Sequence, residues 1–271
     1  EPDHFQKWGM RAINMNHNLF CSAHTGSGKT ILAIHAIAKT ISENKQVIYT
    51  SPIKSLSNQK FKEFSDIFDK DRKNGNVGIL TGDKKDNPTA NILIMTAEIL
   101  RNSLLRKSDE SVYEWNFNPQ KVGCVILDEV HFINNKSRGK VWEDIIINLK
   151  PNIQLVMLSA TLNGADKLVK WIGELKQVPC HFTKTIKRPV PLKHLIFHNN
   201  KLELIMNDEE WNNNKWNEIR KISDFNFNKN RTKSNIPILF KCIKKLKDEN
   251  NLPVNIFLLN RDMVERIANK I

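Results

Sequence analysis

The chain has 271 residues, of which 42 are Lys or Arg and 29 are Asp or Glu, so its formal net charge is +13. No run of residues approaches the ~18–20 apolar positions of a membrane span. The 4 cysteines are scattered without paired spacing, which predicts neither a zinc site nor a disulfide framework. The excess of positive charge favours a polyanionic partner.

Short apolar runs alternate with helical patterns along the first two thirds of the chain. The expected strands are 19–23, 47–51, 77–80, 91–95, 122–127 and 153–158. The expected helices between them are 29–43, 55–69, 97–106, 139–149 and 164–173. Because nearly continuous apolar strands are typical of parallel sheets covered on both faces, the pattern predicts an α/β fold with a doubly wound parallel sheet.

A glycine-rich turn follows the first expected strand and leads into an apolar-periodic helix. It reads Ala23-His24-Thr25-Gly26-Ser27-Gly28-Lys29-Thr30, with Ala23 where the usual P-loop pattern has its first glycine. In a P-loop, backbone N–H groups surround a phosphate, the lysine reaches the β- and γ-phosphates, and the final hydroxyl holds Mg²⁺. The residues expected to bind nucleotide are therefore Thr25, Gly26, Ser27, Gly28, Lys29 and Thr30.

Two carboxylates, Asp128 and Glu129, follow the apolar run 122–127. Ligands bind at the carboxyl ends of strands in an α/β sheet, so Asp128 is expected to hold Mg²⁺ and Glu129 to orient or deprotonate the attacking water. An exposed acidic pair at the end of a strand is common by itself. The strand 153–158, however, delivers Ser159-Ala160-Thr161 in the same way. Three such motifs in this order predict a nucleoside triphosphatase with Lys29, Asp128 and Glu129 as catalytic residues.

The composition changes after the prolines at 189 and 191. Residues 1–195 are expected to form the nucleotide-binding domain, and the Asn-rich stretch 196–235 a linker or an insertion with one short helix. A helix at 236–249, a strand at 254–259 and a helix from Asp262 indicate the truncated start of a second domain within 236–271.

The motifs together resemble a known family. The P-loop, Asp128-Glu129-Val130-His131 and Ser159-Ala160-Thr161 resemble the first RecA-like domain of a superfamily 2 helicase of the DExH type. Further segments are similar to those of Ski2-like RNA helicases, the branch that includes the Ski2 and Mtr4 proteins; they are residues 50–60, 80–83, 95–101, 138–143 and 188–192. One departure is Gly26-Ser27, where that branch typically has Ser-Ala.

The resemblance implies roles for further residues. Phe5 and Gln6 lie where the family reads the adenine of ATP, and His131, Ser159 and Thr161 would couple the nucleotide site to RNA or to a second domain. The residues implied to contact the RNA backbone are Pro52, Lys54, Thr81, Gly82, Thr96 and Arg101.

The function implied is that of an ATP-dependent 3′-to-5′ RNA helicase that uses ATP and Mg²⁺, acts on single-stranded RNA and works in RNA processing or decay, with an exosome-type complex as a candidate partner. An intracellular location, nuclear or cytoplasmic, and no membrane association are expected. A second RecA-like domain would complete the site, so residues 1–271 alone are expected to be poorly active. A Ski2-like DNA helicase and a nucleotide-gated, non-catalytic RNA clamp or scaffold remain alternatives.

Overall fold

The computed structural model describes residues 1–70, 76–105, 118, 120–188, 190–207, 210–229, 236–258 and 260–270. The chain divides into two compact units, Glu1–Pro189 and Val190–Ile271. Some expected features lie outside the described residues: the last residue of the helix ending at 106, Pro189, residues 230–235 and Leu259.

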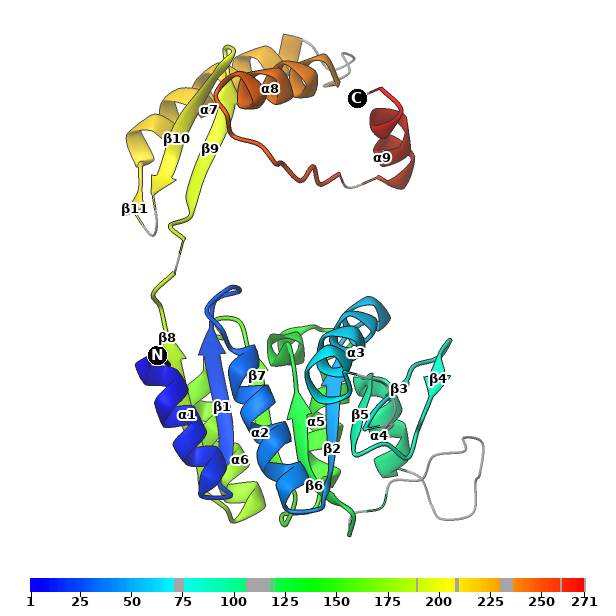
Figure 1. Cartoon of the computed structure of the whole chain (residues 1–271). Helices are drawn as coiled ribbons and strands as arrows, with labels where there is room; N and C mark the ends of the chain where they lie inside the picture. The colour runs from blue at the N-terminus through cyan, green and yellow to red at the C-terminus, as the bar shows by residue number, and fades with distance from the viewer. Residues whose placement is uncertain are drawn as a thin grey trace. The chain divides into compact units, whose positions relative to one another are not determined.

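The first unit is built on one eight-stranded sheet (Figure 1). Its strands are β1 (Asn18–Ala23), β2 (Gln46–Ser51), β3 (Val77–Leu80), β4 (Lys85–Asp86), β5 (Ile92–Thr96), β6 (Val122–Leu127), β7 (Gln154–Ser159) and β8 (Cys180–Thr185). The spatial order is β4-β3-β5-β2-β6-β7-β1-β8, and every pairing except β3 with β4 is parallel. The doubly wound parallel sheet predicted from the sequence is confirmed.

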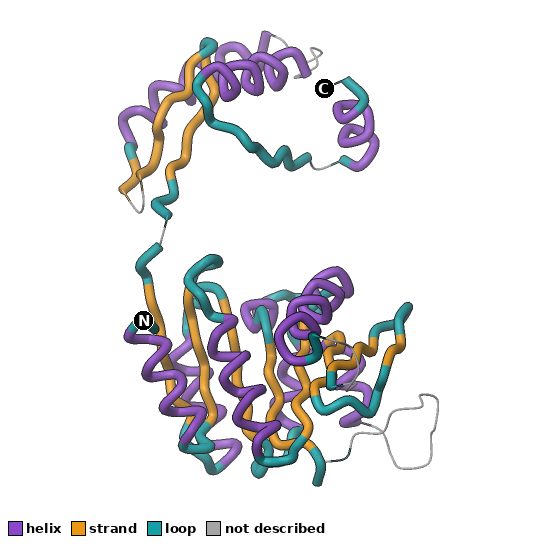
Figure 2. Tube along the Cα trace, in the orientation of Figure 1, coloured by secondary structure: helices purple, strands orange, loops and turns teal. Residues whose placement is uncertain are grey.

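Helices cover both faces of this sheet (Figures 1 and 2). On one face lie α1 (His4–Asn14), α2 (Thr30–Ser42) and α3 (Lys54–Phe68), and on the other α4 (Ala97–Leu105), α5 (Lys140–Asn148) and α6 (Ala165–Lys176). Leu32 and Phe64 bury against the first face, and Trp142 and Ile172 against the second. Two cores on one sheet hold the ends of its strands in fixed positions.

The sequence-based expectations omitted the edge strands of this sheet. Strand β8 lies at one edge, where β1 is its pairing partner among the strands described, and β4 lies at the other edge. Edge strands are partly solvated, and β8 has mostly polar residues of mixed exposure, in contrast to the buried runs of β1 and β6. A search for continuous apolar runs does not detect such strands.

The described residues of the second unit form a small antiparallel sheet in the order β11-β10-β9 and three helices. Its elements are β9 (Lys193–His198), β10 (Lys201–Asn207), β11 (Glu210–Trp211), α7 (Asn213–Lys229), α8 (Ile236–Asp248) and α9 (Arg261–Ala268). The stretch 196–235, expected to be a linker or insertion, thus contains a hairpin and a long helix. Asn199 and Asn200 form the turn with φ of 48° and 59°, which suits the two-residue turns of hairpins.

The expected strand at 254–259 is wrong for the residues that the structure describes, because 254–258 form no strand. A strand exists only where a neighbour accepts its backbone hydrogen bonds, and an apolar run alone does not supply that neighbour. Of the helices described, none combines the length and apolar character needed to cross a membrane.

Candidate active site

The residues singled out in the sequence follow the carboxyl ends of neighbouring parallel strands. In the order β3-β5-β2-β6-β7-β1, the first three strands end at the segments implied to contact RNA, and β1 ends at the P-loop. Between them, Asp128 directly follows β6, and Ser159 is the last residue of β7. His131, Ser159 and Thr161 are implied to couple ATP hydrolysis to RNA. Because they follow β6 and β7, they lie between the P-loop and the segments implied to contact RNA.

The P-loop connects β1 to α2 through two glycines in the left-handed region, Gly26 with φ 83° and Gly28 with φ 78°. A Cβ at Gly28 would lie 2.7 Å from Gln6 Nε2, so a side chain there would be both strained and crowded. Lys29 Nζ donates to the carbonyl oxygen of Ala23 at 2.5 Å. The ammonium group of Lys29 thus lies against the backbone of the loop itself, where a bound phosphate would meet it.

Gln6 connects α1 to this loop. Its Nε2 donates to the carbonyl oxygen of Gly28 at 3.2 Å, and its Oε1 accepts from the backbone N–H of Asp3 at 2.8 Å. The side chain is buried. Both ends of the amide, which the family resemblance assigns to adenine, therefore make contacts within the chain that fix the P-loop relative to the first turn of α1.

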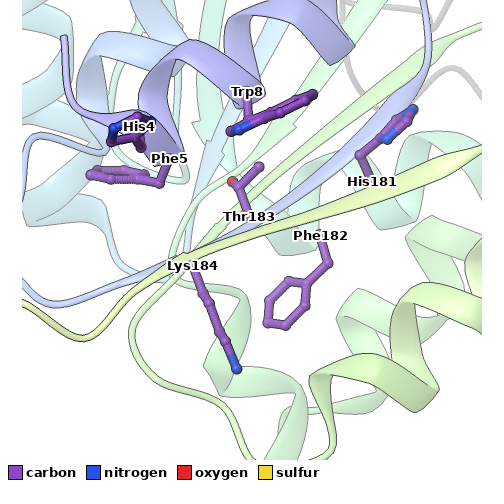
Figure 3. Close-up of a pocket in the computed structure, with 7 residues that line it drawn as sticks. All are labelled: His4, Phe5, Trp8, His181, Phe182, Thr183 and Lys184. Atoms are coloured by element: carbon purple, nitrogen blue, oxygen red, sulfur yellow. The ribbon is translucent and has the colours of Figure 1, made fainter.

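A pocket of about 490 Å³ opens beside the P-loop, lined by Asp3, His4, Phe5, Ser27, Lys184, Thr185 and Lys187. An adjoining pocket of about 350 Å³ shares His4, Phe5 and Lys184 with it. Figure 3 shows His4, Phe5 and Trp8 on α1 above β8, from which Thr183 points toward the helix. Phe5, which the family resemblance assigns to adenine, thus lines a pocket next to the P-loop, and an aromatic side chain of this kind can pack against a nucleotide base.

Asp128 is held at both carboxylate oxygens. The hydroxyl of the fully buried Tyr49 donates to Oδ2, and the backbone N–H of Glu129 donates to Oδ1 at 2.9 Å. Glu129 has φ 54°, a left-handed conformation that is uncommon for a residue with a side chain and is concentrated at functional sites.

The Glu129 carboxyl is half-buried beside two other titratable groups. Burial raises the pKa of Glu129 above its ordinary value, and the Asp128 carboxylate raises it further, while His131, Lys29 and Lys60 oppose the shift. His131 Nδ1 lies 3.2 Å from Glu129 Oε2. A carboxylate with a raised pKa near a phosphate-binding loop is suited to accept a proton from water.

Thr30, the other expected magnesium ligand, accepts a hydrogen bond from Lys60 Nζ at 3.2 Å. The same ammonium group is 2.8 Å from Glu63 Oε2. A hydroxyl from Thr30 and a carboxylate from Asp128 are oxygen ligands of the kind that Mg²⁺ prefers, so the donor set fits this ion.

The Ser159-Ala160-Thr161 segment is attached to β1 by the hydroxyl of Ser22, which donates to the carbonyl oxygen of Ala160 at 3.3 Å. The buried hydroxyl of Ser159 has no hydrogen-bond partner among the described residues, and Thr161 is exposed. A buried hydroxyl of this kind remains available to a neighbouring group that changes its position.

Comparison with known proteins identifies the family. The family described as DEAD/DEAH box helicase matches residues 3–168, which is more than half of the chain. The chain belongs to the DEAD/DEAH box helicase family. Membership implies the use of a nucleotide, in agreement with the P-loop and acidic pair.

Several helicases are similar to this chain. The Exosome RNA helicase MTR4 of Homo sapiens is 37% identical over 280 residues, covering 98% of this chain and 25% of that protein. Superkiller complex protein 2 of Homo sapiens is 44% identical over 201 residues, covering 74% of this chain and 15% of that protein. The Uncharacterized helicase C17H9.02 of Schizosaccharomyces pombe is 38% identical over 263 residues, covering 96% of this chain and 24% of that protein. The Ski2-like resemblance is thereby confirmed, and the chain spans about a quarter or less of the length of these relatives.

A solved structure supports the fold. The DUF1998 helicase MrfA bound to DNA matches with a TM-score of 0.54 and 17% sequence identity, covering 67% of this chain and 27% of that one.

The residues of this helicase domain implied to contact RNA differ in accessibility. Lys54 and Gly82 are exposed, and Lys54 Nζ pairs with Asp83 Oδ2 at 2.6 Å. The side chains of Pro52, Thr81 and Thr96 are buried. Since Thr81 and Thr96 expose little of their hydroxyls, contact with a phosphate backbone at these loops would rely on main-chain groups.

Arg101, the remaining candidate, is an ion-pair partner in the interior of the α4–α5 contact. Its Nε lies 2.6 Å from Asp144 Oδ2, and both side chains are mostly buried. Arg138 is bound in a similar way, because its guanidinium donates to the carbonyl oxygen of Pro52 and to Glu98. Arg138 thereby joins the loop after β2 to the first turn of α4.

The sequence reasoning missed three kinds of residue at this site. Tyr49 had a detectable signal, since a tyrosine in a buried apolar strand requires a hydrogen-bond partner. Lys60 had none beyond its place in a helix. Lys184 and Lys187 belong to none of the motifs found in the sequence, but they line the pocket beside the P-loop.

Proposed function

We propose that this chain forms the ATP-binding part of an ATP-dependent RNA helicase of the Ski2/Mtr4 type. The observation that carries the proposal is the single sheet edge on which the P-loop and the acidic pair lie beside the loops similar to RNA-contacting motifs. Two similar proteins are named as an exosome RNA helicase and a superkiller complex protein, which favours RNA over DNA as the substrate.

In the proposed reaction, the N–H groups of residues 25–30 and the ammonium of Lys29 bind the phosphates of ATP. Thr30 and Asp128 would hold Mg²⁺, which when bound would supply positive charge to the phosphates of ATP. A water oxygen attacks the γ-phosphorus, the bond from this phosphorus to ADP breaks, and Glu129 accepts the proton that the water loses. Lys29 stabilises the negative charge that develops on the γ-phosphate, since phosphoryl transfer depends on positioning and electrostatics.

His131, Ser159 and Thr161 are proposed to couple this reaction to RNA. The segments at Pro52, Lys54, Thr81, Gly82 and Thr96, together with Arg101 of α4, would bind the RNA backbone without reading bases, as a translocating enzyme requires. Movement in the 3′-to-5′ direction, a role in RNA processing or decay with an exosome-type complex, and a nuclear or cytoplasmic location are further parts of the proposal.

The second unit is proposed to begin another RecA-like domain, within residues 236–271. Helicase sites of this type are completed by a second such domain that brings an arginine to the γ-phosphate, a contribution of about 10³–10⁵ in rate in comparable phosphoryl-transfer enzymes.

The proposal is tested by measuring ATP hydrolysis by the full-length protein with single-stranded RNA, single-stranded DNA or neither. Stimulation by RNA above DNA is the expected result. The variant Glu129→Gln should retain RNA and ATP binding while turnover falls by at least ~10²-fold, because the proton acceptor is removed and the phosphate contacts remain.

Each alternative gives a different outcome in the same experiment. Preferential stimulation by DNA would support a DNA helicase. Tight, ATP-dependent RNA binding without turnover in the wild type would support a non-catalytic clamp. Near-normal hydrolysis by Glu129→Gln would contradict the assignment of the acidic pair.

A further inference from the structure

The hydroxyl of Tyr49 lies where it can determine the position of Asp128. Tyr49 is on β2, two residues before that strand ends, and its side chain is fully buried. Strand β2 pairs with β6, and Asp128 follows the last residue of β6. A phenol buried this deeply loses its contact with water, so its hydroxyl needs a partner inside the protein. The partner is Asp128 Oδ2.

The Tyr49 ring is itself held in place. It packs against Phe64 of α3 edge-on, with ring centroids 5.1 Å apart and an interplanar angle of 82°. Phe64 is also fully buried. With its ring fixed between the sheet and α3, the Tyr49 hydroxyl can point in few directions.

The other oxygen of the Asp128 carboxylate accepts from the backbone N–H of Glu129 at 2.9 Å. The backbone of Asp128 is fixed as well, because its N–H donates to the carbonyl oxygen of Thr50 at 3.0 Å. In the part of the chain that the structure describes, the N–H of Glu129 restrains Oδ1 and the Tyr49 hydroxyl restrains Oδ2. Without that hydroxyl, rotation of the carboxylate would be limited at one oxygen alone.

We propose that Tyr49 is a positioning residue for the metal ion of the nucleotide site, holding the Asp128 carboxylate in the orientation that binds Mg²⁺. The inference rests on the proposed function, since it assigns Asp128 as a ligand of the magnesium that accompanies ATP. Hydrogen bonds to a metal-binding carboxylate fix its orientation, and removing such a partner typically lowers metal affinity by about 10–100-fold.

A purely structural role for Tyr49 makes a different prediction. If the hydroxyl only satisfies a buried donor, its removal will lower the stability of the protein and leave the dependence on Mg²⁺ unchanged. The variant Tyr49→Phe separates the two roles because it keeps the ring and its packing against Phe64. The fold is expected to survive, and circular dichroism checks this directly.

The residue next to Tyr49 offers a matched control. Thr50 is equally buried on the same strand, and its hydroxyl donates to the carbonyl oxygen of Ile126 at 3.3 Å. The variant Thr50→Val removes this hydroxyl with little change of shape and leaves the backbone bond to Asp128 intact. It therefore reproduces the loss of a buried hydroxyl without changing the contacts of the Asp128 carboxylate.

The experiment measures the binding of a fluorescent, non-hydrolysable ATP analogue to the full-length protein as a function of Mg²⁺ concentration. For Tyr49→Phe, the Mg²⁺ concentration at half-maximal binding is expected to rise by about tenfold or more relative to the wild type. For Thr50→Val it is expected to stay within about twofold. The free energy of unfolding, measured with urea for both variants, reports the structural cost separately.

An unchanged Mg²⁺ midpoint in folded Tyr49→Phe would overturn the inference, and so would an equal shift in Thr50→Val. The proposed function fails in a different way, namely if the wild type itself binds the analogue with no dependence on Mg²⁺.

Discussion

Glu129 is subject to opposing electrostatic influences. Burial and the Asp128 carboxylate raise the pKa of the Glu129 carboxyl above its ordinary value, while His131, Lys29 and Lys60 act in the opposite direction. A general base must be deprotonated to accept a proton. Hydrolysis is therefore expected to be lost as the pH falls through this raised pKa, which places the acidic limb of the pH–rate profile above the range of an ordinary glutamate.

The variant Lys60→Met should move the acidic limb of the pH–rate profile to higher pH. Removing a positive charge that opposes the shift raises the pKa of Glu129 further, so a smaller fraction of the enzyme is deprotonated at a given acidic pH. The measurement is kcat against pH at saturating ATP and Mg²⁺.

Lys62 provides the control for this prediction because it is exposed on the same helix, α3. Lys62→Met should leave the profile close to that of the wild type. An acidic limb that stays in place in Lys60→Met, or moves equally in both variants, would contradict a local effect of Lys60 on Glu129.

At the level of single residues, the sequence predicted the groups that belong to contiguous motifs and missed those that act across the fold. Lys29 and Asp128 are recognisable because each follows an apolar run at a motif-specific position. Tyr49 meets Asp128 only after folding, across 79 positions in the sequence. The pairing depends on β2 lying beside β6, and that strand order cannot be derived from the spacing of motifs.

Among the elements, the segment that begins α5 has a connecting role. Arg138 immediately precedes Gly139, where a Cβ would lie 2.0 Å from the carbonyl oxygen of Ile133, so only glycine fits this turn. The turn directs the Arg138 guanidinium to Pro52 and Glu98. Arg138 thus joins the loop after β2 to the first turn of α4, and both of these segments contain residues implied to bind RNA.

Replacing Arg138 with alanine should therefore weaken RNA binding. Loss of two charge-assisted contacts releases the loop after β2 from α4, and the affinity for single-stranded RNA is expected to fall by about tenfold. Affinity for the ATP analogue should remain near that of the wild type. Fluorescence anisotropy with labelled RNA measures the first quantity, and the analogue titration measures the second.

The exposed Lys136 allows the effect of charge alone to be subtracted. Lys136→Ala removes one positive charge two residues away, which by itself reduces non-specific attraction to a phosphate backbone. An equal loss of RNA affinity in both variants would argue against a specific role for the Arg138 contacts.

The elements that the sequence predicted best are those buried on both sides. Strands β1, β6 and β7 are apolar along nearly their whole length, and this pattern suffices to locate them. Strand β8 and the hairpin around Asn199 are half-solvated, so their patterns resemble those of loops. The prediction of a strand at 254–259 was wrong for the opposite reason. The run is largely apolar, but its described residues, 254–258, pair with no described strand.

At the scale of the whole chain, the two cores of the first unit lie entirely within Glu1–Pro189. Both cores share the same eight-stranded sheet, so neither can form without the strands that support the other. Residues 1–189 alone are expected to fold and to unfold in a single cooperative transition, because the described residues of both cores belong to this unit.

Urea unfolding of residues 1–189, followed by circular dichroism and tryptophan fluorescence, measures this property. Coincident transitions for the two probes are the expected result. Non-coincident transitions, or binding of a hydrophobic dye in the absence of urea, would show that the first unit depends on the rest of the chain.

The pairing of β8 with β1 has a mechanical consequence. Thr185, the last residue of β8, is in register with Ala23, the last residue of β1, and the first unit ends at Pro189, just after β8. A pull on the chain along β8 loads its hydrogen bonds to β1 in shear, so that the paired positions from Asn18 to Ala23 share the force. Tension applied along β8 is therefore separated from Ala23, the start of the P-loop, by a single row of hydrogen bonds.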